Sequence, residues 1–125
     1  MLKMFLITGA GGFLGTGLRY LSQRFIAHYF TVSFPYGTLI INITGSLLIG
    51  IIFALSEKTR ILTPDMRMFL AIGLCGGYTT FSSFALDSYG LLKDSQYLYF
   101  TTYLFSSVIL SILAVIAGIW FIKSL

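Results

Sequence analysis

Long stretches without a charged side chain constrain this chain more than any other feature. No full charge occurs in residues 25–56, 68–86 or 95–122. A membrane-spanning helix needs about 20 mainly apolar residues. Only 10% of the 125 residues are charged, whereas a soluble domain averages about 25%. The sequence therefore predicts an all-α integral membrane protein that forms a single transmembrane domain, residues 1–125.

Residue patterns at the span ends predict where the helices begin. Proline is tolerated at the first helical position, and Pro35 and Pro64 both fall at such points. Thr63 is expected to be an N-cap, with Asp65 near the positive end of the helix dipole. Ser95 is expected to cap the last helix in the same way. The predicted transmembrane helices cover residues 4–27, 35–56, 65–92 and 96–123.

A glycine pattern near the N-terminus imitates a nucleotide-binding motif. Gly9, Gly12 and Gly15 have the spacing of a dinucleotide fingerprint, which requires a strand, a helix and an acid about 20 residues later. The first acid here is Glu57, and no alternating strands and helices follow. We therefore expect no nucleotide. Gly11 and Gly15 form a GxxxG pair, and these glycines together predict a face for close helix packing.

Few groups are present that could bind a metal through side chains or contact nucleic acid. The single Cys75 excludes an internal disulfide, and one histidine and four acids are too few for an all-protein metal cage. The scattered Lys and Arg residues form no basic run of the kind that binds nucleic acid.

The charges give only a weak indication of orientation. With four spans, one side carries five cations and the other three, namely Lys3, Lys58, Arg60, Arg67 and Lys123 against Arg19, Arg24 and Lys93. The positive-inside rule favours both ends in the cytoplasm. A chain that inserts in both orientations and pairs antiparallel with itself fits equally well.

The third span contains a run that is unfavourable for a continuous helix. Residues 73–84 read GLCGGYTTFSSF, and each glycine costs about 1 kcal/mol in a helix interior relative to alanine. A break near the middle would free backbone carbonyls, which discontinuous transporter helices use to hold a cation. The alternative is a kinked but unbroken helix.

Polar side chains inside the other spans indicate either a partner or a pathway. Thr38 and Asn42 share one face of the second helix, while Tyr103, Ser107 and Ser111 recur every four residues along the fourth. The simpler alternatives are a helix–helix hydrogen bond for Asn42 and close packing for the serines.

Phe81 and Phe84 are neighbours three residues apart, and the edge of an aromatic ring is electropositive. Amide N–H groups, hydroxyls and ring edges suit a small anion better than a cation. Arg19, His28 and Asp87 lie towards span ends, so no titratable group is expected in the middle of the path.

Three segments together resemble the Fluc family of fluoride channels, also called CrcB. They are GGFLGTGLRY (11–20), GTLIINITGSLLIG (37–50) and GLCGGYTTFSSF (73–84), and the resemblance extends over the whole chain. One position differs mildly, because Ser83 stands where many members have threonine. The resemblance implies a passive channel, not an enzyme, that exports cytoplasmic fluoride and lowers its toxicity in the bacterial inner membrane.

The resemblance also implies an assembly and residue roles. Fluc channels are antiparallel homodimers with two pores and a structural sodium ion at the centre of the dimer. Backbone carbonyls of Gly76 and Thr79 would hold the sodium ion, and Arg19 matches the first-helix arginine of the family. The residues that match the fluoride pore are Asn42, Phe81, Phe84, Thr38, Ser82, Tyr103, Ser107 and Ser111.

Two other classes of protein share some of these sequence features. A small multidrug transporter also has four helices, but that class uses a glutamate embedded in its first helix, and the only glutamate here is Glu57, in a loop. A non-transporting assembly factor would give no flux from the purified protein alone.

Overall fold

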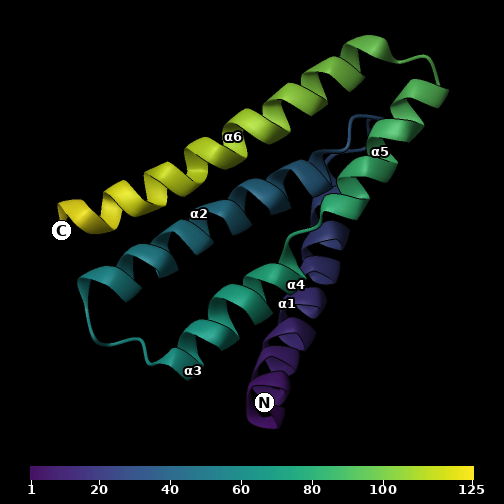
Figure 1. Ribbon diagram of the computed structural model, residues 1–125. Helices are drawn as coiled ribbons and strands as arrows, with labels where there is room; N and C mark the ends of the chain where they lie inside the picture. The colour runs from purple at the N-terminus through teal and green to yellow at the C-terminus, as the bar shows by residue number, and fades with distance from the viewer.

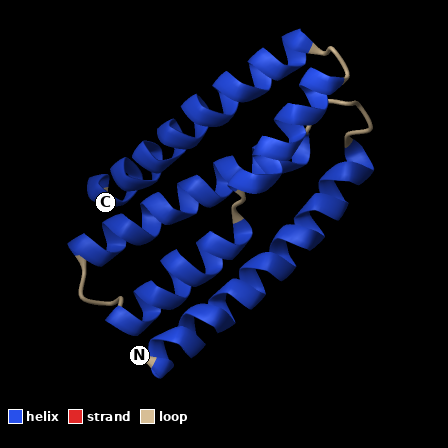
Figure 2. Cartoon of the chain, turned by 45° about the vertical axis from the view of Figure 1, so that its right-hand side comes forward, coloured by secondary structure: helices blue, strands red, loops and turns tan.

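The computed structural model describes residues 1–125 and contains only helices and short connections (Figure 1). Three consecutive segments, α3, the π-helix η1 and α4, run on as one rod, and α5 follows after a break (Figure 2). The prediction of four helices with a broken third one is therefore confirmed. The bounds are α1 Leu2–Tyr29, α2 Tyr36–Lys58, α3 Pro64–Arg67, η1 Met68–Cys75, α4 Gly76–Tyr78, α5 Phe81–Lys93 and α6 Tyr97–Ser124.

The arrangement of the helices places α2 in the middle of the molecule. α6 packs along α2, and α1 packs along η1 and α4. Both chain ends lie at one end of the molecule together with the connection from α2 to α3, as four crossings require (Figure 2). α2, the third span and α6 are each long and apolar enough to cross a membrane.

Of the three predicted helix starts, the one at Thr63 and Pro64 is confirmed. Pro35 lies one residue before α2, as its N-cap, so α2 begins at Tyr36. Thr63 Oγ1 accepts a hydrogen bond from Met66 N at 3.2 Å, with Pro64 at the first helical position. Ser95 does not cap α6. Its φ of 58° is left-handed, and its amide closes the turn onto Leu92 O at 3.1 Å, so α6 begins only at Tyr97.

Glycines allow the backbones of α1 and η1 to come into direct contact. Gly11 and Gly15 are both buried. A Cβ at Gly11 would collide with the Phe69 carbonyl, and one at Gly15 with the Leu74 carbonyl. The predicted packing role of this pair is confirmed, but its extension to Gly9 is wrong, because Gly9 faces open space.

This packing predicts a position-specific effect of alanine substitutions in α1. Gly15→Ala should lower the stability in detergent by about 1–3 kcal/mol, because the added methyl forces two backbones apart. The matched control is Gly17→Ala on the same helix, where no atom lies within 4 Å of the added Cβ. Thermal unfolding of both variants measures the difference, and equal melting temperatures would contradict the packing role of Gly15.

Candidate functional site

The third span is interrupted by two consecutive threonines. Thr79 (φ −83°, ψ 157°) and Thr80 (φ −151°, ψ 115°) are both extended, between the end of α4 and the start of α5. The Thr80 side chain caps α5, because its Oγ1 accepts from Ser83 N at 3.1 Å. The break therefore follows the glycine pair Gly76–Gly77 and lies in the extended threonines.

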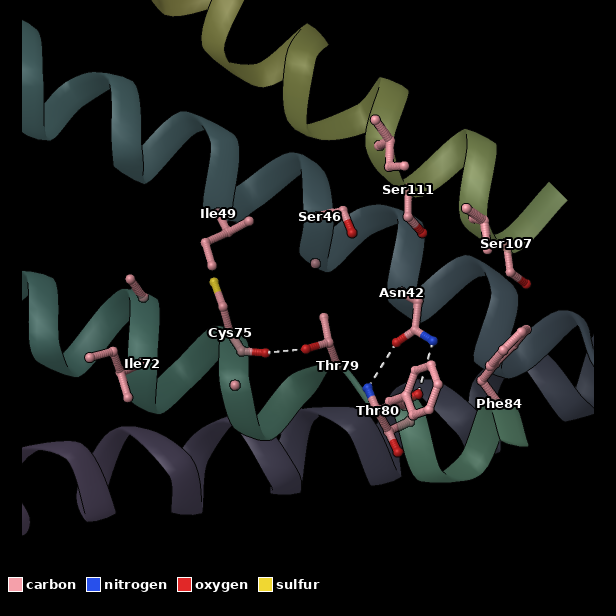
Figure 3. A pocket seen from close by; sticks show the side chains of 16 residues that line it. Asn42, Ser46, Ile49, Ile72, Cys75, Thr79, Thr80, Phe84, Ser107 and Ser111 are labelled. Atoms are coloured by element: carbon pink, nitrogen blue, oxygen red, sulfur yellow. Dashed lines mark hydrogen bonds between the residues drawn. The ribbon is translucent and has the colours of Figure 1, made fainter. Parts of the chain in front are cut away.

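Asn42 on α2 holds this break in place (Figure 3). Its Nδ2 donates to Thr80 O at 3.0 Å, and its Oδ1 accepts from Thr80 N at 2.8 Å. In a continuous helix the Thr80 amide would donate to the Gly76 carbonyl instead. One side chain thus satisfies both backbone groups of Thr80, and the Gly76 carbonyl loses its helical donor.

The end of α4 offers oxygen atoms suited to a hard cation. The amide and the hydroxyl of Thr79 both donate to the Cys75 carbonyl, at 2.9 and 2.8 Å. The last carbonyls of a helix have no following amides to bind, which leaves those of Gly76 and Thr79 available. No group of His, Cys, Asp and Glu side chains could hold a metal, so backbone oxygens are the fitting ligands.

An open groove of about 660 Å³ runs beside the break, between α2, the third span and α6. The groove brings most of the predicted site residues together (Figure 3). The predicted residues that line it are Asn42, Gly76, Thr79, Phe81, Phe84, Ser107 and Ser111. Ser107 Oγ is buried and has no hydrogen-bond partner in the chain.

The two phenylalanines lie in very different surroundings. Their ring centroids are 5.6 Å apart. Phe84 packs on Tyr103 at 5.2 Å, as part of a core cluster with Phe34 and Leu91. Phe81, in contrast, is 80% exposed on the free surface of the chain.

The remaining predicted residues lie outside the groove. Tyr103 is completely buried, and its hydroxyl donates to Asp87 Oδ2 at 3.0 Å. Thr38 is buried as well and accepts from Gln23. Ser82 is exposed in the first turn of α5.

Arg19 is the last of these residues. It is partly exposed on α1, away from the groove, and forms no ion pair or hydrogen bond.

Four polar groups of the site were not predicted from the sequence. Thr80 supplies the backbone groups that Asn42 binds, and Ser46 and Cys75 line the groove. Asp87, which the sequence places towards a span end, accepts a hydrogen bond from the Tyr103 hydroxyl. The signal was present, because an ionisable side chain inside a membrane span usually has a functional partner.

The fold and the site together define a class. No charged side chain lines the groove, which offers an amide, hydroxyls and aromatic rings beside a broken span. Broken spans with neutral polar linings belong to multi-pass membrane proteins that move solutes.

Comparison with known proteins identifies the family. The chain belongs to the family described as "CrcB-like protein, Camphor Resistance (CrcB)", whose model matches residues 6–119.

Curated relatives match over nearly their full length. A protein of Phocaeicola vulgatus is 45% identical over 95% of this chain and 98% of its own. One of Rhizobium meliloti is 43% identical, covering 96% of each chain, and one of Leptospira interrogans is 38% identical over 98% of this chain and 96% of its own. Each is named a fluoride-specific ion channel FluC. The family is therefore one of membrane ion channels and not of enzymes.

Proposed function

We propose that this protein is a fluoride-specific ion channel that releases cytoplasmic fluoride passively. The observation that carries the proposal is the groove of neutral hydrogen-bond donors beside the broken third span. Fluoride is small and strongly hydrated, so a selective pore must replace its water with well-placed donors and still let the ion leave. Amide and hydroxyl hydrogens that line a groove can replace the hydration water of fluoride, and they bind the ion less tightly than a fixed cation would.

Asn42 and Ser107 are the proposed donors along the groove. Asn42 Nδ2 carries two hydrogens, and only one of them is used by Thr80 O. The Ser107 hydroxyl has no partner in the chain, and Ser111 lies one turn further along α6. The first amides of α5 add a positive helix end at the same depth.

The rings of Phe81 and Phe84 are proposed to present their electropositive edges to the ion. Thr38, Ser82 and Tyr103 continue the polar lining beyond the groove in this proposal, and Arg19 lies towards the entrance.

A sodium ion at the break is proposed as a structural element. The Gly76 and Thr79 carbonyls of one copy supply too few ligands for a monovalent cation. Two copies arranged antiparallel would bring two such pairs together around one ion. When bound, the ion would supply fixed positive charge at the centre of the assembly.

The antiparallel homodimer, with two pores, also accounts for the weak charge bias. Each side of the membrane would then carry the five cations of one copy and the three of the other. In a cell with a negative interior, passive conduction expels an anion, which would protect enzymes that fluoride inhibits. A multidrug transporter is disfavoured, because Glu57 is exposed at the end of α2 and pairs with Lys123 at 3.6 Å.

The test is fluoride efflux from liposomes that contain the purified protein, with chloride-loaded liposomes alongside. We expect rapid fluoride release with chloride retained. Release of both ions would refute the proposed selectivity. No release of either ion by a protein shown to be dimeric would refute the channel and favour an assembly role.

A further inference from the structure

Two further pairs of polar side chains join helices outside the groove. Gln23 Nε2 on α1 donates to Thr38 Oγ1 on α2 at 3.3 Å. Tyr103 on α6 donates to Asp87 Oδ2 on α5 at 3.0 Å. Thr38 is only 4% exposed and Tyr103 is completely buried.

The hydrogen bond between Gln23 and Thr38 has a defined direction. An amide N–H only donates, whereas a hydroxyl both donates and accepts. The Gln23 amide occupies the acceptor side of the Thr38 hydroxyl. The hydrogen of the Thr38 hydroxyl must therefore point away from Gln23, into the protein.

Gly37 is what allows the Gln23 side chain to lie against α2. A Cβ at Gly37 would collide with Gln23 Oε1 and come within 3.2 Å of its Cδ. Because those atoms are at the end of a flexible side chain, an added methyl would displace the amide and leave the helices in place. Gly37 therefore offers a second, independent way to move the same amide.

We propose that Gln23 is a positioning residue of the fluoride path. Its side-chain amide fixes the Thr38 hydroxyl as a hydrogen-bond donor, and an anion can be bound only by the hydrogen of a hydroxyl. The inference rests on the proposed fluoride conduction and on the role of Thr38 in it. It adds a residue of α1 that acts through Thr38 and does not touch the ion.

The test is fluoride efflux from liposomes with Gln23→Met, which keeps the size of the side chain and removes the N–H donor. We expect efflux about three- to tenfold slower, as the loss of one hydrogen bond implies. Gly37→Ala should slow efflux by a similar factor while the melting temperature stays the same or rises, because alanine favours the helix. In a Thr38→Val background, Gln23→Met should cause no further loss.

The matched control is Gln96→Met, because Gln96 lies outside the groove and its side chain forms a hydrogen bond only with the exposed Ser33. The efflux of this variant should equal that of the wild type. Wild-type efflux in Gln23→Met would overturn the proposal. The proposal would also be overturned if Gln23→Met slowed efflux by the same factor in the wild-type protein and in the Thr38→Val background. Gln23 would then act independently of Thr38. A wild-type protein without fluoride efflux would overturn the channel function together with this inference.

Discussion

Asn42→Leu should abolish fluoride efflux and lower the stability of the protein by about 2–4 kcal/mol. The leucine is similar in size, but it leaves the buried N–H and C=O of Thr80 unpaired, and each such group costs about 1–3 kcal/mol. The proposed donor to the ion is lost at the same time. Efflux from liposomes and unfolding in detergent measure the two effects separately.

A second substitution tests the donor role of Asn42. Asn42→Asp keeps an acceptor for Thr80 N but loses the donor to Thr80 O, and it places a negative charge beside the path. We expect an equally complete loss of efflux and a loss of stability at least as large, because a carboxylate oxygen would face the Thr80 carbonyl. Thr44→Val is the control on the same helix, since Thr44 is exposed and bonds mainly its own backbone. Normal efflux in Asn42→Leu would remove Asn42 from the mechanism.

Phe81→Ile and Phe84→Ile should each reduce fluoride efflux by about tenfold to a hundredfold, with the proposed dimer still assembled. Isoleucine retains apolar bulk and lacks the electropositive ring edge, and each tenfold loss corresponds to about 1.4 kcal/mol at the barrier. The two substitutions differ in their effect on side-chain packing. Phe84 packs in the core against Tyr103, whereas Phe81 is exposed. A loss of fluoride efflux in Phe81→Ile therefore could not be explained by disturbed folding of the single chain.

The control for the rings is Phe105→Ile on α6, which removes an exposed phenylalanine outside the groove. Its efflux should match the wild type. Size-exclusion chromatography of each variant checks assembly. Wild-type efflux in both Phe81→Ile and Phe84→Ile would exclude the rings from the proposed ion path.

The fold could be predicted from the sequence because a lipid bilayer limits the structures that can cross it. A chain without charges over the length of a span has few alternatives to a helix, and proline at helix starts fixes the boundaries. The glycines indicated where the third span would weaken. The sequence could not place the break at Thr79 and Thr80, because Asn42 competes for the Thr80 amide and lies on another helix.

The candidate site was predictable only as a set of residue types. The spacing of the hydroxyls on α6 indicated a shared face, and Ser107 and Ser111 do line the groove. The spacing could not distinguish these serines from Tyr103, whose hydroxyl on α6 donates a hydrogen bond to Asp87 on α5. The sequence also did not predict that η1, before the break, is a π-helix.

The close backbone contact between α1 and η1 has a consequence for biogenesis. α1 is less apolar than α2 or α6, because it contains Arg19, Arg24 and five glycines. Gly11 and Gly15, which make it less apolar, are also the residues that let η1 approach. α1 leaves the ribosome first, but its docking surface is synthesised only after α2. The close packing of α1 on η1 can therefore form only after the third span has been synthesised, so α1 reaches its final contacts late although it is made first.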